Sequence, residues 1–354
     1  NYYYNVEEFD LKEFEYDSIK NQPDISLQLK NLNRYKVIII AKPTIPFNKL
    51  DKFLIDQYIM NGGKLLLLID GVNASIDSIN NQNGYFIASK NDLNLDDQLF
   101  KYGVRINSDL VQDLRSTEIP IVTGYSNNRP IQELFKWPYY PLISSKNNHP
   151  ITNSLDGIKS DFISSIDTLK NNIKKTILLE SSNNSRLAQA PSKVSLGIIE
   201  NPPPNESYNK ENITLAVLLT GEFISVFKDR IIPKNNDINF KKSSDSTSII
   251  IVSDGDIIAN EVSSSGNAFP LGYDRYINYT FDGNKKFIIN AIQYLNDHNG
   301  LINLRSKNIK LRLLNNEKIS NYRTLITMIN LILPILIFLF LILIINHKNK
   351  LKYD

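Results

Sequence analysis

The most distinct hydrophobic pattern lies near the end of the chain. From Leu325 to Ile345 the sequence reads LITMINLILPILIFLFLILII, 21 residues without a charged side chain. A helix of this length rises by about 30 Å, which is the thickness of the hydrocarbon core of a bilayer. A buried core helix is the alternative, but such a helix normally has polar positions on one face. The pattern therefore predicts a transmembrane helix over residues 324–346, followed by a short basic tail over 347–354.

Upstream, the hydrophobic pattern alternates between strands and helices. Tyr35–Ala41 and Lys64–Asp70 are short continuous apolar runs, which is the pattern of strands buried on both faces. Between them, residues 47–61 have apolar side chains at helical spacing, and Gly62-Gly63 stands where a helix would end. A strand, a helix and a second strand in this order predict a right-handed βαβ unit.

The rest of the chain extends this alternation. Thr214–Thr220 and Ser248–Ser253 are typical of further buried strands, and Lys285–Asn296 is typical of an amphipathic helix. Elsewhere the pattern weakens into short alternating runs broken by Pro and Asn clusters. We therefore predict an α/β fold with a doubly wound, mostly parallel sheet and an irregular insertion over about residues 114–246. The predicted α/β domain covers 1–300, a basic neck covers 301–323, and the membrane helix follows.

Composition and charge narrow the function classes. The 354 residues include 40 Lys and Arg against 37 Asp and Glu, so the net charge is +3, whereas a nucleic-acid-binding domain normally has a strong basic excess. The chain has no Cys and only three His, which removes thiolate chemistry and leaves few residues for a zinc site. It contains no P-loop, dinucleotide-binding or G-x-S-x-G motif. We therefore predict no catalytic residues, no metal, no cofactor and no nucleic-acid partner.

Polar side chains follow the predicted strands at the edge where an open α/β sheet binds its ligands. Lys42 and Thr44 follow the first strand, Asp70 follows the second, and Asp254 and Asp256 follow the last. These residues are candidates for a ligand crevice, because the three aspartates could meet as a site for a cation or a polar ligand. The alternative is structural, since Asp-Gly turns commonly end strands and Asp caps a following helix.

The predicted membrane helix has one polar face. Thr327, Asn330 and Pro334 lie within about 60° of one another on a helix with 3.6 residues per turn. Polar side chains in a membrane span tend to hydrogen-bond to a neighbouring helix. We therefore predict that this face packs on a transmembrane helix of a partner; a lone span that faces lipid is the alternative. A count of the basic residues around the span would place the large domain in the cytoplasm, but this count is reliable only for short loops, so charge alone leaves the orientation open.

Several longer motifs carry a family resemblance. In chain order they are KPTIPF (42–47), DQYIMNGGKLLLLID (56–70), DLNLDDQLFKYGVRIN (92–107), WPYYPL and NNHPIT (137–152), IDTLKN and IKKT (166–176), SDGDII (253–258), LGYDR (271–275) and GLINLRSKNIKLRLL (300–314). In these motifs the sequence resembles the GldG family, the gliding-motility-associated auxiliary (substrate-binding-like) proteins of an ABC transporter in Bacteroidetes. The resemblance covers effectively the whole chain.

The resemblance implies a GIFT- or amidotransferase-like α/β domain in the periplasm, anchored in the inner (cytoplasmic) membrane, with residues 347–354 in the cytoplasm. It implies assembly with a multi-span permease subunit of the GldF type and, through it, with a cytoplasmic ATPase, in support of gliding motility and the associated secretion machinery. Family members usually begin with another membrane helix and a small domain, so we expect a further segment upstream of Asn1. The family has no established catalytic residues, so none are transferred. Amidotransferase-like relatives use a Cys nucleophile, which this chain lacks.

Three function classes remain at this point. The first is a non-catalytic auxiliary subunit of an ABC-type membrane complex. The second is a membrane-tethered α/β hydrolase, which would need a nucleophile and a base that converge in the crevice. The third is a periplasmic binding module for cell-wall glycan or a secreted partner, which would present exposed aromatic side chains. The first candidates for such a patch are Trp137, Tyr139 and Tyr140, for which packing in a core is the alternative.

Overall fold

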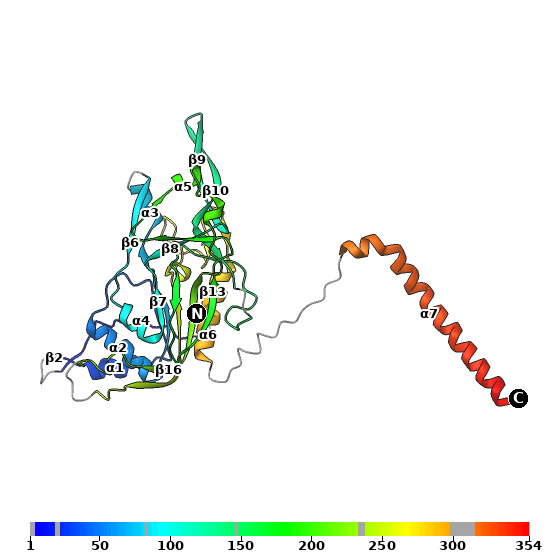
Figure 1. The fold of residues 1–354 in the computed structure, drawn as a ribbon, viewed down its shortest axis with the longest axis horizontal. Coiled ribbons are helices and arrows are strands. Elements are labelled where there is room, and N and C mark those ends of the chain that lie inside the picture. The colour runs from blue at the N-terminus through cyan, green and yellow to red at the C-terminus, as the bar shows by residue number, and fades with distance from the viewer. Residues whose placement is uncertain are drawn as a thin grey trace. The chain divides into compact units, whose positions relative to one another are not determined.

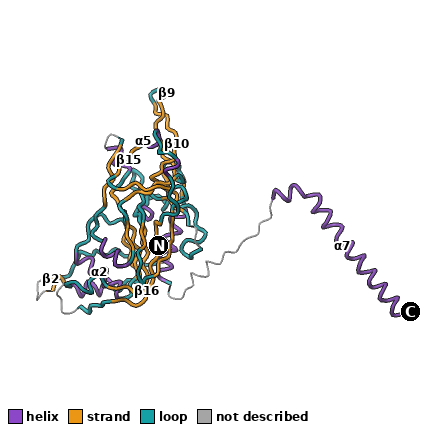
Figure 2. Tube along the Cα trace, in the orientation of Figure 1, coloured by secondary structure: helices purple, strands orange, loops and turns teal. Residues whose placement is uncertain are grey.

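The chain forms two units, residues 1–306 and 307–354, which we describe separately. The computed structural model describes residues 4–17, 22–81, 84–145, 148–232, 238–297 and 316–353. Strands and loops dominate the first unit, whereas the described part of the second is a single helix (Figure 2). Of the predicted basic neck, residues 301–315 lie outside the described residues, and 316–323 belong to this helix.

A five-stranded sheet forms the centre of the first unit (Figure 1). Its strands lie in the order β13 (Lys174–Glu180), β16 (Thr214–Ile224), β17 (Ser243–Val252), β4 (Lys64–Leu68) and β3 (Val37–Ala41). The neighbours β3, β4 and β17 are parallel, whereas β16 is antiparallel to both β17 and β13. The sheet is therefore mixed, where the sequence pattern predicts a mostly parallel one.

The direction of β16 accounts for this difference. Residues 225–242 connect β16 to β17, and the described part of this connection contains no α-helix. A parallel return to the same sheet needs a crossover, which is usually helical, so a connection without a helix favours reversal of the strand. A continuous apolar run indicates burial on both faces of a sheet but does not indicate direction. Both β13 and β16 fall within 114–246, so this range supplies two strands of the central sheet.

Helices cover both faces of the sheet, as a doubly wound arrangement requires. One face packs against α1 (Ile25–Leu32), α2 (Lys49–Met60) and α4 (Asp96–Tyr102), and the other against α6 (Asp282–Asn296). Neighbouring residues of one strand alternate between the two cores: Leu65 and Ile251 face the first group of helices, and Leu66 and Ile250 face α6. The central strands consequently contain continuous apolar runs, such as residues 65–68 of β4 and 249–252 of β17, and these runs are why their positions could be predicted from the sequence.

The predicted βαβ unit is present as β3, α2 and β4. The helix begins after a capping box in which the Asn48 side chain accepts hydrogen bonds from the backbone N–H groups of Leu50 and Asp51. It ends before Gly62, whose φ of +90° is favourable only for glycine. Apolar side chains at helical spacing usually leave a polar face exposed, but in α2 the polar residues Asp51, Asp56 and Gln57 are buried as well.

Small antiparallel sheets accompany the central sheet, and several of them enclose a third core. Their members are β5 (Val72–Asn73), β6 (Tyr85–Lys90) and β15 (Ser192–Ser195); β7 (Val104–Ile106) and β12 (Ile166–Thr168); β8 (Asp109–Asp113) and β14 (Ser185–Gln189); β9 (Ser116–Ser126), β10 (Arg129–Ile143) and β11 (Ile158–Lys159). The remaining short elements are β1 (Tyr16–Asp17), β2 (Gln22–Pro23), α3 (Ile76–Asn81), α5 (Gly197–Glu200), η1 (Asn205–Ser207), η2 (Asp256–Ile258), β18 (Tyr273–Asp274) and β19 (Tyr279–Thr280). Figure 1 shows β9 and β10 as a paired ribbon that projects from the first unit.

The second unit confirms the predicted apolar helix. Helix α7 runs from Asn316 to Tyr353 and contains Pro334 without interruption. Its segment Thr327–Ile345 is long and apolar enough to cross a membrane, and the side chains of that segment are exposed. A helix whose apolar side chains are exposed all round is suited to a lipid environment rather than to water.

Candidate functional site

The carboxyl ends of β3, β4 and β17 meet at one edge of the central sheet. Leu68 of β4 pairs with Val252 of β17, so Asp70 and Asp254 each follow their strand by two residues and lie side by side. Carboxylate oxygens of these two residues and of Asp256 all lie within 4.8 Å of one another. The structure thus brings the three predicted aspartates into one group, which we call the strand-end cluster.

Lys42 completes the strand-end cluster. Its ammonium group forms an ion pair with Asp256, and its Nζ lies 3.9 Å from Oδ2 of Asp70. Burial lowers the pKa of Lys42, but the carboxylates of Asp256, Asp70 and Asp254 raise it more, so the net shift is upward. Thr44 is exposed and lines a cavity beside Phe9, which includes Lys42 but none of the three aspartates of the cluster.

Backbone N–H groups donate hydrogen bonds to two carboxylates of the cluster, those of Asp70 and Asp254. The N–H of Gly255 donates to Oδ1 of Asp70 at 2.6 Å, and Asp254 accepts from Asp256 N–H at 2.6 Å and from Asp161 N–H at 3.0 Å. The close approach also requires a glycine at 255, since a Cβ there would lie 2.6 Å from Cβ of Lys42. These contacts tie the ends of three strands together, which is the structural alternative that the Asp-Gly pattern allows.

The strand-end cluster contains one cation, Lys42, beside its three carboxyl groups. Burial raises the pKa of Asp254 well above its ordinary value, and burial also raises the pKa of Asp70. A metal ion would have to displace the ammonium group of Lys42 from the carboxylates. The cluster therefore has its own cation, and its chemistry is that of a salt-bridged junction between strands.

A cavity of about 320 Å³ lies next to the cluster and shares Asp256 with it. Its charged and aromatic lining includes Tyr140, Lys159, Asp161, Glu261, Arg275 and Tyr276, none of which the strand-end pattern marks as a ligand residue. The motifs WPYYPL (137–142), SDGDII (253–258) and LGYDR (271–275) reach this region, but they carry a family resemblance rather than a spacing typical of a site. These residues come from four separated parts of the chain, so no local pattern could have predicted the cavity.

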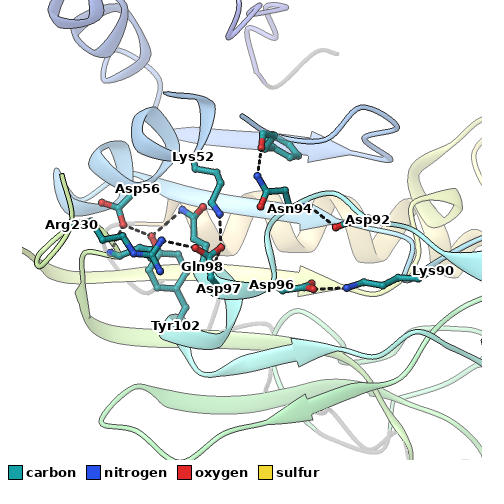
Figure 3. A network of polar contacts seen from close by, with 12 residues as sticks. Lys52, Asp56, Lys90, Asp92, Asn94, Asp96, Asp97, Gln98, Tyr102 and Arg230 are labelled. Carbon is teal, nitrogen blue, oxygen red and sulfur yellow. Dashed lines mark hydrogen bonds and ion pairs between the residues drawn. The ribbon is translucent and has the colours of Figure 1, made fainter. Parts of the chain in front are cut away.

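A second polar network explains another motif, the run DLNLDDQ at 92–98. Figure 3 shows that Lys52 and Arg230 converge on Asp97, and the Nη1 of Arg230 lies 2.6 Å from Oδ2 of Asp97. Nearby, the buried carboxylate of Asp56 accepts a hydrogen bond of 2.9 Å from the hydroxyl of Tyr102. The network joins α2, α4 and the segment after β16, and it does not open into the cavity beside the cluster. Its role is to hold the fold.

The family model described as "ABC-type uncharacterized transport system" matches residues 1–291. The chain belongs to this family. It is thus an auxiliary component of an ABC-type transport system, with an apolar helix beyond the matched residues that is suited to a membrane anchor. No curated protein matches the chain significantly.

Comparison with solved structures gives a distant similarity. One structure, described as "mmIFT52 N-terminal domain", is similar with a TM-score of 0.38 and 13% sequence identity, over 77% of this chain and 81% of that chain. A TM-score of this size establishes no shared fold, so the GIFT-like fold that the resemblance implies stays a prediction.

The aromatic candidates for a glycan patch lie in the interior. Trp137, Tyr139 and Tyr140 are 0%, 3% and 2% exposed and pack around Phe162 in the third core. Core packing, the alternative at these positions, is therefore correct, and these residues do not form an exposed aromatic surface.

Proposed function

We propose that the protein is a membrane-anchored, non-catalytic auxiliary subunit of an ABC-transporter-type complex that supports gliding motility and the associated protein secretion. The observation that carries the proposal is the order of the two units: a domain of the ABC-type transport family, followed by a helix with 19 residues apolar enough to span a membrane. Such a helix keeps the domain at the membrane that contains the transport subunits.

The proposed location is the inner membrane, with the large domain in the periplasm and the residues after 346 in the cytoplasm. Support for this orientation comes from the family resemblance of the motifs. A count of basic residues around the span would place the domain on the other side, but long domains cross membranes largely regardless of their charge.

The proposed partner is a multi-span permease subunit of the GldF type, which in turn binds a cytoplasmic ATPase. The contact on this chain is the polar face of the membrane helix formed by Thr327, Asn330 and Pro334. Asn330 is the strongest hydrogen-bonding group of that face, and such contacts between membrane helices contribute about 0.6–2 kcal/mol. Ile332 lies two residues after Asn330, which places it on roughly the opposite side of the helix at about 100° per residue. It therefore provides a matched control position.

The arrangement of the strand-end cluster supports a non-catalytic role. Its cation, Lys42, is bound by carboxylates, and both oxygens of Asp254 accept backbone hydrogen bonds. A catalytic group must instead be free to exchange a proton or to attack a substrate. The cluster therefore suits a rigid support for the sheet edge better than it suits a reaction.

The experiment that tests the proposal is a pull-down of the tagged full chain in mild detergent, followed by mass spectrometry. Recovery of a multi-span ABC permease together with an ATPase is expected. Recovery of the chain by itself, from membranes in which both of those proteins are detected, would contradict the proposal. The gliding role is tested separately by deletion of the gene, which should abolish gliding while the cells continue to grow.

A further inference from the structure

The cavity beside the strand-end cluster is lined by charged side chains, some of which have ion-pair partners and one of which has an oxygen without a hydrogen-bond partner among the described residues. Its two cations are both paired: Nζ of Lys159 lies 3.0 Å from Glu261, and Nε of Arg275 lies 2.6 Å from the other oxygen of the same carboxylate. Another carboxylate that lines the cavity, Asp256, is paired with Lys42 of the strand-end cluster. Among the lining residues that the structure describes, the cavity therefore offers no free cation that could bind an anionic ligand.

Asp161 is different from the other lining carboxylates. Its Oδ1 is buried and has no hydrogen-bond partner among the residues that the structure describes. Its own backbone N–H donates to Asp254, so the residue is fixed between the cluster and the cavity. A buried polar atom without a partner is costly, and most such atoms in proteins bind water, an ion or a ligand.

The surroundings of Asp161 favour a positively charged donor. Burial raises the pKa of Asp161 to about 7; Lys159 lowers it, and the carboxylates of Asp256, Asp274 and Glu261 raise it further. The other titratable groups that face this point are Asp254, Tyr140 and Tyr276. Near neutral pH the carboxyl group thus exchanges a proton readily, and a cationic ligand can take the place of that proton.

An organic ammonium group fits this site better than a metal ion does. The group of carboxylates with metal-like spacing is already paired with Lys42, and of its three aspartates the cavity lining includes Asp256 alone. The rings of Tyr140 and Tyr276 line the cavity, and aromatic rings attract ammonium groups through their faces. Lys159 already uses this interaction, with its Nζ 5.9 Å from the centre of the Tyr140 ring.

We propose that this cavity binds a small organic molecule through a protonated primary amine, with the carboxylate of Asp161 as its counter-ion. A volume of about 320 Å³ is at the lower end of ligand pockets, so the ligand is a metabolite-sized amine rather than a polymer. The proposal is independent of the transport complex, because every residue involved belongs to the first unit.

The test uses the full chain in detergent micelles and saturation-transfer NMR with two matched pairs of water-soluble probes. Ethanolamine is compared with ethylene glycol, and glucamine with sorbitol, so that each pair differs in an amine against a hydroxyl group. The amines should receive saturation at pH 8 and the polyols should not. Below about pH 7 the affinity for the amines should fall by roughly tenfold per pH unit, as Asp161 becomes protonated.

Two variants make the test specific. Asp161→Asn retains the shape of the side chain and should abolish the amine signal. Asp167→Asn removes an exposed carboxylate that is paired with Arg105 outside the cavity, and it should leave the signal unchanged. Fluorescence of the buried Trp137 shows whether each variant is folded. Equal signals from amines and polyols, an amine signal that persists in Asp161→Asn, or no signal for either amine at pH 8 would overturn the proposal.

Discussion

Replacement of Asp56 by Ala should destabilise the first unit more than any surface change in the same network. The carboxylate of Asp56 is fully buried and accepts hydrogen bonds from the hydroxyl of Ser225 at 2.6 Å, the N–H of Val226 at 2.9 Å and the hydroxyl of Tyr102 at 2.9 Å. The first two donors lie about 170 residues away in sequence, so the contact joins α2 to the segment after β16.

The magnitude follows from the donors that lose their acceptor. Each buried donor left without a partner costs about 1–3 kcal/mol. The two hydroxyl groups can turn toward other acceptors, whereas the N–H of Val226 cannot, so we expect a loss of about 3–5 kcal/mol for Asp56→Ala. Tyr102→Phe removes one donor and leaves the carboxylate its others, so its cost should be about 1–2 kcal/mol. Asp96→Ala removes an exposed partner of Lys90 and should cost less than about 1 kcal/mol.

The assay is guanidinium unfolding of the full chain in mild detergent, followed by the fluorescence of Trp137, the one tryptophan of the sequence. Because the native contacts change but the exposed surface does not, the midpoint should shift while the slope of the transition stays constant. A loss below about 1 kcal/mol for Asp56→Ala, or a loss equal to that of Asp96→Ala, would refute the view that this buried carboxylate holds the two segments together.

Three further predictions concern other parts of the chain. Gly255→Ala should cost about 1–3 kcal/mol in a denaturant titration, because the new Cβ would meet Lys42 at 2.6 Å; Gly124→Ala, which meets nothing within 4 Å, should cost far less, and equal costs would contradict the clash. Burial raises the pKa of Asp161 to about 7, above its unfolded value of about 4, so the folded state binds more protons between these pH values and loses stability as the pH rises through them. Asp161→Asn should reduce that loss in unfolding titrations from pH 4 to pH 8, and an unchanged pH dependence would count against the shift. Asn330→Leu should reduce recovery of the permease in the pull-down several-fold, while unchanged recovery would argue for a span that faces lipid.

The parts of the fold that the sequence predicts are those in which the environment repeats along the chain. β4 is buried on both faces, so each of its residues after Lys64 is apolar, and the helix before it ends at a glycine that its backbone requires. The apolar helix around Pro334 is equally local, because 19 successive residues share one environment. Patterns of this kind reveal the type of an element and its approximate ends.

The parts that the sequence did not predict depend on contacts between distant residues. The run Thr214–Thr220 has the same composition whether its strand is parallel or antiparallel, so its direction depended on a connection without a helix. Asp56 looks like a surface residue of an amphipathic helix until its donors at 225 and 226 are known.

The candidate site shows the same division between local and distant information. The convergence of Asp70, Asp254 and Asp256 follows from the rule that parallel strands end at one edge. The position of Lys42 near them also follows from this rule, but its ion pairs with Asp256 and Asp70 do not. The cavity around Asp161 is formed by segments without a recognisable pattern, and it became visible only in three dimensions.

The central claim, that this chain is an anchored auxiliary subunit of an ABC-type transport complex, is tested most directly inside the membrane. A photo-crosslinking residue placed at position 330 of the full chain in living cells should form an adduct with a multi-span ABC permease, and the same residue at position 332 should not. An adduct with that permease at 330 alone is the result that we predict. Adducts only with lipid, or no permease adduct at either position, would contradict the account.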